Sequence, residues 1–369
     1  RGAVAELVYG VLRQRRMLEE FVRDIEGEDL TQRSVAAYLC QFCGWGGRVL
    51  EERGFARSGT AISTRFRQLD RNALPFALHY SFPDWLAKRM LSQYGEQEAV
   101  ALAVSLNTPA TLDVRVNTLK GTRDELMARF AQEGVVLEPT PFSPWGLRRH
   151  DRAPLFKYAD FRAGWFEVQD EASQLVSMLL EVRNRETVID FCAGAGGKTL
   201  HIASLMRNTG SVYAVDVSER RLEKLKPRLK RTGLDNVRVM AVQDEADEAL
   251  NPLKEQAHRV LVDAPCTGTG TLRRNPDIKW RPIDLEKLLL QQASILSAAA
   301  QLVRPGGRLV YATCSIVDDE NEGVVAAFLA QSPEFSRLDA QAILERQGVK
   351  IDQAGTPLGA VQLRPDRHA

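Results

Sequence analysis

The sequence has no long apolar run, almost no net charge and few cysteines. No stretch of its 369 residues approaches the ~18 consecutive apolar residues of a membrane-spanning helix, so we expect no membrane span. The net charge is +1, so attraction to a polyanion must come from local basic patches. Five cysteines are an odd number, which favours a reducing, cytoplasmic compartment with working thiols over a disulfide framework.

The remaining composition is that of a globular protein. Hydrophobic residues make up 44% and charged residues 26%, which excludes long disorder. At roughly 150 residues per domain, the length predicts two or three domains. Because the chain begins at Arg1 rather than Met, we expect a fragment or a processed product whose upstream targeting signals cannot be judged. We expect a monomer.

Residue patterns divide the chain into three parts. Residues 1–72 carry apolar residues at helical spacing, as at Ala5, Val8 and Leu12, and predict a helical segment. Residues 73–160 predict a small α/β domain. Its expected elements are helices at 85–94 and 99–106, a strand at 111–116, a helix at 123–133 and a short strand at 135–137.

Residues 161–369 alternate regularly between strand and helix patterns. The predicted strands are 187–191, 211–216, 237–242, 259–263 and 308–313. The predicted helices are 198–206, 219–231, with a possible kink at Pro227, and 284–303. Such alternation is typical of a parallel, doubly wound α/β sheet of the Rossmann type.

A glycine-rich turn follows the first of these strands, at residues 192–199. Glycines allow close approach of the backbone to a ligand, and the helix that follows presents its N-terminus to negative charge. Asp216 closes the next strand, where an acid can bind the two ribose hydroxyls of a nucleoside. The turn and the acid together predict a nucleoside-type cofactor site.

Gly197, Lys198 and Thr199 also resemble the end of a phosphate-binding loop, with Asp263 on the strand that would bind magnesium. The first glycine of that motif would fall at Cys192. The loop would therefore lack the residue that permits its opening turn. A nucleotide hydrolase remains an alternative function.

Two cysteines follow the last two predicted strands. Cys266 lies in the segment Asp263-Ala264-Pro265-Cys266, and Cys314 in Thr313-Cys314-Ser315. Because ligands bind beyond the carboxyl ends of parallel strands, we expect both thiols and Asp263 to converge on the glycine-rich turn.

A thiol beside a nucleoside-type cofactor suits one reaction in particular. Carbon 5 of cytosine is a poor nucleophile until a thiolate adds to carbon 6 and makes the ring an enamine. Carbon 5 can then attack a methyl sulfonium, and a second thiol has a place in releasing the product. A carboxylate such as Asp263 could hydrogen-bond the edge of the cytosine.

The linked motifs resemble those of the RNA (cytosine-5)-methyltransferases of the Fmu/Sun-like branch. The resemblance covers residues 85–368 and rests on the segments 166–173, 192–199, 263–266, 273–280 and 313–315. It implies S-adenosylmethionine as cofactor, Cys314 as the nucleophile and Cys266 as the thiol that assists release. It also implies an RNA-recognition-like domain ahead of the catalytic domain, and RNA as the partner, with ribosomal RNA favoured and transfer RNA possible.

The resemblance also assigns the cofactor site and shows two departures from the family pattern. The cofactor-binding residues would be Cys192, Ala193, Gly194, Ala195, Gly196, Gly197, Lys198, Asp216, Asp244 and Asp263. Gly194 and Ala195 stand where the family has Ala and Pro, and the lost proline frees one φ angle in the turn. The family's closing strand after the arginine-histidine stretch is absent from this sequence.

Basic residues around the expected site predict RNA contacts. Arg273, Arg274 and Lys279 could bind phosphates, and Trp280 offers an aromatic surface for an unpaired base. The basic run over residues 220–231 is either part of that surface or a solvated helix face. Cys40 and Cys43 lack the second pair that a zinc site needs, so we expect no metal. A non-catalytic RNA-binding protein is the other alternative.

Overall fold

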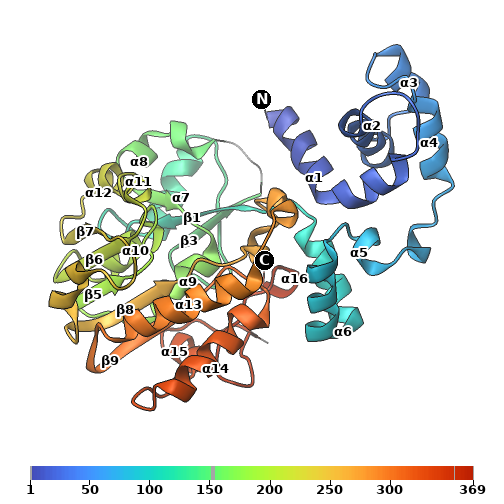
Figure 1. Ribbon diagram of the computed structural model, residues 1–369. Helices are drawn as coiled ribbons and strands as arrows, with labels where there is room; N and C mark the ends of the chain where they lie inside the picture. Colours follow the sequence, from blue (N-terminus) through green and yellow to red (C-terminus); the bar gives the residue numbers. More distant parts are fainter. Residues whose placement is uncertain (1, 151–153, 353, 369) are drawn as a thin grey trace.

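The computed structural model describes residues 2–150, 154–352 and 354–368, and its N-terminal helices lie to one side of two α/β units (Figure 1). These helices are α1 (Gly2–Val22), α2 (Leu30–Cys43), α3 (Gly47–Glu52) and α4 (Gly59–Arg67). Their apolar faces form a separate core that includes Met17, Leu39 and Ile62. Helix α2 ends where Gly44 adopts a left-handed φ of 71°, which glycine accepts without steric cost.

The next segment packs on residues of the third part of the chain, 161–369. It contains the 3-10 helix η1 (Arg71–Ala73), α5 (Phe76–His79) and the long α6 (Asp84–Leu106), which is kinked at Gly95. Its core residues, among them Leu86 and Leu102, pack with Leu272 and Ile316. Residues 76–106, which the sequence predicts as part of the small domain, therefore pack on residues of the third part of the chain.

The small domain is a four-stranded antiparallel sheet in the order β2-β3-β1-β4. Its elements are β1 (Leu112–Val116), α7 (Arg123–Gln132), β2 (Glu138–Pro139), β3 (Gly146–Arg149), η2 (Leu155–Lys157), α8 (Ala159–Arg162) and β4 (Phe166–Val168). This β-α-β-β-α-β order is the ferredoxin-like arrangement. The predicted strand at 135–137 is wrong: the Val135 N–H donates to the carbonyl of Phe130, so the segment closes the turn after α7.

The larger sheet has five parallel strands in the order β7-β6-β5-β8-β9, which confirms the predicted fold class. The strands are β5 (Thr187–Asp190), β6 (Ser211–Asp216), β7 (Val237–Ala241), β8 (Ala257–Asp263) and β9 (Val303–Ala312). Helices cover both faces: Ile189 and Val260 pack with α13 on one face, and Val188 and Leu261 pack with α10 on the other.

The helices of this sheet include one break that the sequence predicted as a kink. They are α9 (Glu171–Leu179), α10 (Gly197–Leu205), α11 (Glu219–Leu222), α12 (Leu225–Thr232), η3 (Glu248–Leu253) and α13 (Leu285–Ala300). The expected helix over 219–231 is two helices, because Pro227 has no N–H to donate and occupies the first turn of α12.

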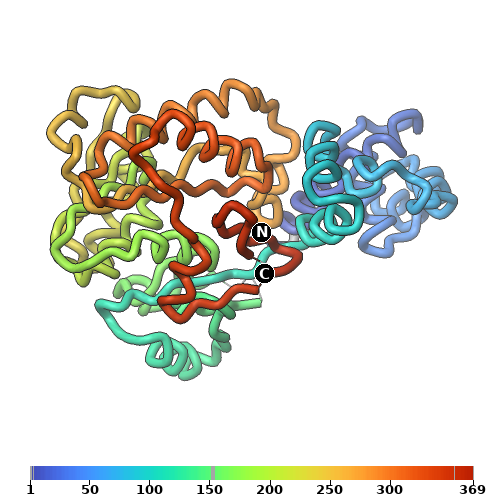
Figure 2. The backbone as a smooth tube through the Cα atoms, turned by 90° about the horizontal axis from the view of Figure 1, so that it is seen from below, coloured from blue at the N-terminus to red at the C-terminus, as the bar shows by residue number. Residues whose placement is uncertain are grey.

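The C-terminal segment crosses from the large sheet to the small one, as the red tube in Figure 2 shows. Ile351 and Leu363 pack against Leu175 of α9 and Trp145 of the small domain. The remaining elements are η4 (Thr269–Thr271), η5 (Pro276–Trp280), η6 (Asp318–Glu320), α14 (Glu322–Gln331), α15 (Ala340–Glu345) and α16 (Pro365–His368). No helix in the described ranges has the length and apolar character to cross a membrane.

Candidate active site

The two predicted thiols lie side by side. The Sγ atoms of Cys266 and Cys314 are 3.2 Å apart, and the backbone N–H of Cys314 donates to the Cys266 sulfur at 3.3 Å. They meet because β8 and β9 are adjacent and parallel, so the loops after both strands leave the same edge of the sheet. Cys314 is exposed and Cys266 half-buried. The exposed sulfur is thus the one that a substrate can reach.

The pKa values of the two thiols are shifted in opposite directions. The hydrogen bond from Cys266 lowers the pKa of Cys314, and the Lys198 ammonium adds to this effect. The same hydrogen bond, together with burial, raises the pKa of Cys266. Cys314 is therefore the thiol that ionises first, with Cys266 as its hydrogen-bond donor. The thiolate is the nucleophilic form of cysteine.

A lysine–aspartate pair stands beside the thiols. The Nζ of Lys198 is 2.6 Å from Asp263 Oδ2, and Lys198 lies at the start of α10. Burial works against the charged lysine, but Asp263 outweighs it and raises the pKa of Lys198. The ammonium consequently stays charged beside the thiols, with the Asp263 carboxylate still one-third exposed.

The glycine-rich turn contains two glycines with positive φ angles. Gly194 (φ 56°) and Gly196 (φ 81°) are left-handed, and a Cβ on Gly196 would lie 2.2 Å from Leu225 Cδ1. Asp216 accepts the N–H of Gly194 at 2.8 Å and of Ser218 at 2.7 Å. The two bonds orient its carboxylate toward the turn. Cys192 begins the turn, and burial raises the pKa of its thiol, which disfavours the thiolate.

Asp190 is a buried acid of this site to which the sequence reasoning gave no role. It ends β5, is 1% exposed and accepts a hydrogen bond from Thr199 Oγ1 at 2.6 Å, whereas its Oδ1 has no partner. Burial, with added repulsion from Asp263 and Asp216, raises the pKa of Asp190 to about 7. The signal available in the sequence was its position, at the end of the central strand directly before the turn.

We expect Asp190 to make stability fall as pH rises. Its folded pKa of about 7 exceeds its ordinary value of 3.8, so the folded chain binds the proton more tightly and stability is lost as pH rises through 7. Between pH 5 and 8, the unfolding free energy of the wild type should drop by about 3 kcal/mol relative to Asp190→Asn. Urea unfolding of both proteins at the two pH values measures this. Parallel changes in the two proteins would show that Asp190 is ionised throughout.

Two predicted residues lie farther from the thiols. Asp244 is exposed in the loop after β7, at the same sheet edge as Asp216, and accepts the N–H of Ala246. Arg274 pairs with Asp170 and donates to the carbonyl of Thr111. A cleft of about 1660 Å³ includes Arg274, Lys198, Asp263 and Cys314 in its lining. Most of that cleft follows the edge of β9 away from the cofactor turn, so the cofactor site and the cleft meet only at this end.

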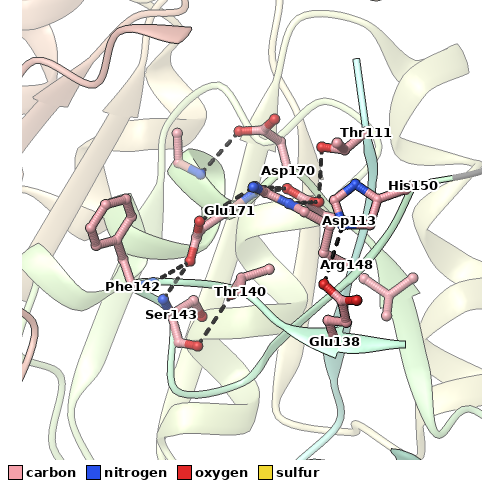
Figure 3. Close-up of polar contacts among 12 residues, drawn as sticks. Thr111, Asp113, Glu138, Thr140, Phe142, Ser143, Arg148, His150, Asp170 and Glu171 are labelled. Atoms are coloured by element: carbon pink, nitrogen blue, oxygen red, sulfur yellow. Dashed lines mark hydrogen bonds and ion pairs between the residues drawn. The ribbon is translucent and has the colours of Figure 1, made fainter. Parts of the chain in front are cut away.

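The start of α9, at Asp170 and Glu171, joins the site to the small domain (Figure 3). Asp170 caps α9 by accepting the N–H of Ala172, and the adjacent Glu171 accepts the N–H groups of Phe142 and Ser143 at 2.7 and 2.6 Å. Asp113 of β1 holds Arg148 in a two-point ion pair. These buried contacts fix the small sheet against α9 and so place it at the rim of the cleft.

Lys279 and Trp280 do not form the predicted RNA surface. Lys279 is 3% exposed, and its ammonium donates to the carbonyls of Arg13 and Ser81 and to Oδ1 of Asn107. The indole N–H of Trp280 donates to the carbonyl of Leu12. Arg273 donates to the carbonyl of Pro109. These residues fasten α1 and α6 to the catalytic part, because η5 lies between them.

Replacing Lys279 by alanine should destabilise the fold. The change removes three hydrogen bonds that a buried ammonium donates, which costs about 3 kcal/mol or more. We expect a lower Tm, measured by calorimetry. The dependence of RNA affinity on salt concentration should stay as in the wild type. Lys88, exposed on α6, offers a control in Lys88→Ala. A normal Tm with a shallower salt dependence of RNA binding would instead mean that Lys279 reaches phosphate.

The basic run is also partly internal. Arg228 pairs with the buried Glu167 of β4 and donates to the carbonyl of Ala195 in the glycine-rich turn. Arg231 pairs with the same carboxylate. The turn that lacks a proline is thereby tied to the small sheet through Arg228. The sequence could show the charges but not their partners.

The parallel sheet, the left-handed glycines and the acid on β6 define a Rossmann-type fold with a candidate site for a nucleoside-type cofactor. Residues 177–369 match the family model described as 16S rRNA methyltransferase RsmB/F, and residues 82–154 match an RsmF/B-like, ferredoxin-like domain. The chain belongs to this RsmB/F family. The alternative of a phosphate-loop hydrolase has no support from these matches.

Curated relatives and solved structures agree with the family. A probable ribosomal RNA small subunit methyltransferase B of Synechocystis is 37% identical over 72% of this chain and 60% of its own length. One from Bacillus subtilis is 31% identical over 91% and 81%. The crystal structure of PH0851 matches 99% of this chain and 87% of its own, at 28% identity and a TM-score of 0.80. The chain thus spans about three-fifths of the first relative.

Proposed function

We propose that this protein transfers a methyl group from S-adenosylmethionine to carbon 5 of a cytosine in RNA. The observation that carries the proposal is the pair of thiols 3.2 Å apart at the ends of β8 and β9, with the Lys198–Asp263 pair beside them. A family of RNA methyltransferases supplies the class of reaction.

S-adenosylmethionine is the cofactor of this family, and the residues of the turn fit it. It supplies an electrophilic methyl group when bound. The oriented Asp216 carboxylate would accept the ribose hydroxyls, the left-handed glycines leave the backbone open to close approach, and Asp244 lies at the rim for the adenine. Residues 192–198 and Asp263 would form the rest of the site.

Cys314 would attack carbon 6 of the cytosine as a thiolate. The new S–C6 bond pushes the C5–C6 electron pair to carbon 5, which becomes nucleophilic. Asp263 would hydrogen-bond the polar edge of the base and favour the electron-poor ring. After methylation, solvent water would take the carbon 5 proton, the C5–C6 double bond would re-form, and the S–C6 electron pair would leave with Cys314 as its thiolate. Cys266 assists this release from its position beside the leaving sulfur.

Ribosomal RNA is the proposed substrate, with transfer RNA as the alternative, and the cytoplasm the proposed location. Relatives named for the small-subunit ribosomal RNA support the first choice. We propose three domains: a helical segment over 1–72, a small RNA-recognition-like domain that begins at 73, and a catalytic domain that ends at 369. The pairing of β4 with β1 favours moving the boundary between the small and the catalytic domain from 160 to about Val168. Arg274 remains a proposed phosphate contact. A monomer is proposed.

The test is methyl transfer from labelled S-adenosylmethionine to unmodified ribosomal and transfer RNA, followed by digestion to nucleosides and mass spectrometry. We expect 5-methylcytidine in the small-subunit ribosomal RNA. Label in a different nucleoside would refute the chemistry. Cofactor and RNA binding without any label would favour the non-catalytic RNA-binding alternative.

A further inference from the structure

Glu320 is a buried carboxylate behind the two thiols that the proposed mechanism does not use. It is 0% exposed and belongs to η6, six residues after Cys314. Its Oε1 accepts the backbone N–H of Thr267 at 2.8 Å and the side-chain amide of Gln292 at 3.0 Å. Its Oε2 accepts the hydroxyls of Thr267, at 2.5 Å, and Ser315. Four donors therefore converge on one side chain.

These donors come from both cysteine loops. Thr267 directly follows Cys266, and Ser315 directly follows Cys314. Gln292 extends from α13 and also donates to the carbonyl of Pro265, the residue before Cys266. A single carboxylate thus connects the residue after each thiol and the helix beneath them.

Asn321 completes the connection on the Cys314 side. Its Oδ1 accepts the Thr313 hydroxyl at 2.5 Å, and its amide donates to the carbonyls of Ser315 and Val317 at 3.0 and 3.1 Å. The loop on both sides of Cys314 is therefore held from within by two consecutive residues. The backbone N–H of Gly270 donates to the carbonyl of Cys314 at 2.9 Å and adds a further tie between the loops.

We propose that Glu320 is a positioning residue that sets the separation of Cys266 and Cys314. Without its carboxylate, the Thr267 N–H loses its acceptor and neither hydroxyl links the loops through Glu320. The Ser315 hydroxyl still shares hydrogen bonds with Thr267 and Thr269, but the backbone after Cys266 is no longer held by an acceptor, so the 3.2 Å contact between the thiols loosens. The catalytic consequence rests on the proposed function, but the geometric claim does not.

The chemistry of the four donors predicts which substitutions preserve the geometry. On the Oε1 side, the Thr267 N–H and the Gln292 amide can only donate, so an oxygen is required there. On the Oε2 side, both partners are hydroxyls, which can accept as well as donate. Glu320→Gln therefore fits with its amide group turned to the hydroxyls. Glu320→Ala cannot restore either side.

Dibromobimane tests the proposal on the free protein. The reagent fluoresces strongly only when two thiolates each displace one bromide, so it reports on thiols within reach of each other. All variants carry Cys40→Ser and Cys43→Ser, which removes the other closely spaced pair. We expect rapid linking in this background and with Glu320→Gln, and linking slowed about tenfold with Glu320→Ala. Wild-type linking in a folded Glu320→Ala protein would overturn the proposal.

Two further variants separate positioning from general stability. Glu171→Ala removes another buried carboxylate, which accepts the backbone N–H groups of Phe142 and Ser143 in the small domain and none from the cysteine loops. This variant should lower the Tm without slowing the linking. Ser315→Ala keeps the Glu320 carboxylate but removes its link to the Cys314 loop, together with the hydrogen bonds of the Ser315 hydroxyl to Thr267 and Thr269. It should slow the linking on its own if Glu320→Ala does not fold. Normal linking in Ser315→Ala in that case would also overturn the proposal.

A catalytic readout distinguishes this proposal from the proposed function. In methyl transfer, Glu320→Ala should lower kcat roughly 100-fold, as misplacement of a reacting group does, with little change in the KM for S-adenosylmethionine. If Glu320→Ala slows the linking but the wild-type protein transfers no methyl group, the positioning role is sustained and the proposed reaction is refuted. If Glu320→Ala links normally and the wild-type protein transfers methyl groups, the proposed reaction is sustained and the positioning role is refuted.

Discussion

Replacing Cys314 by alanine is expected to abolish methyl transfer, with a loss of at least ~10³-fold in kcat. Cys314 is the exposed member of the thiol pair, and its pKa is lowered by the hydrogen bond from Cys266. Without the thiolate, carbon 5 of the cytosine has no source of electron density. The rate is measured with labelled S-adenosylmethionine and the RNA identified by the nucleoside assay.

The controls separate this chemical defect from misfolding. The variant should bind S-adenosylmethionine with unchanged Kd, because the cofactor turn lies on the loop after β5 rather than after β9. Cys40→Ala, on α2 in the N-terminal helices, should keep full activity. A fully active Cys314→Ala protein would show that the thiol assignment is wrong.

Replacing Cys266 by alanine should trap the enzyme on its RNA. The nucleophile Cys314 is still present, so the covalent bond to carbon 6 forms, but the step that removes the carbon 5 proton and frees the sulfur lacks its assistant. We expect a protein–RNA adduct that survives denaturing gel electrophoresis and accumulates to about one per enzyme, with turnover reduced by ~10²-fold or more.

The double variant is the decisive control for that adduct. Cys266→Ala combined with Cys314→Ala should form none, because no thiolate remains to bond carbon 6. Loss of the Cys266 hydrogen bond also removes the largest cause of the lowered pKa of Cys314, so the adduct should form more slowly at pH 7 than at pH 9. An adduct that persists in the double variant would place the bond on another residue.

The strand–helix alternation made much of the catalytic fold predictable. Five strand patterns with helical patterns between them gave the parallel sheet, since apolar strands buried on both faces read as continuous runs. The small sheet was less complete in the sequence. Its fourth strand, β4, lies beyond the expected limit at 160, and two-residue β2 has no pattern of its own.

The chemistry-bearing residues could be found in the sequence because they sit at fixed offsets from strand ends. Cys266, Cys314, Asp263 and Lys198 meet in the structure as the topology of a parallel sheet requires. The surface residues could not be assigned in this way. Lys279 reads as a phosphate contact, yet it is buried against carbonyls of residues that lie up to 266 positions away.

The sequence by itself determined the alternating strands of the sheet, the glycine-rich turn after β5, the acid at the end of β6 and the positions of the two thiols. Each of these features depends on neighbours within a few residues. Only the tertiary structure decided which basic side chains form internal ion pairs and which buried carboxylate contacts the two cysteine loops. Arg228 and Glu320 make their contacts over 33 to 61 and 5 to 53 positions of the chain. Such partners are set by packing, and no local pattern encodes them.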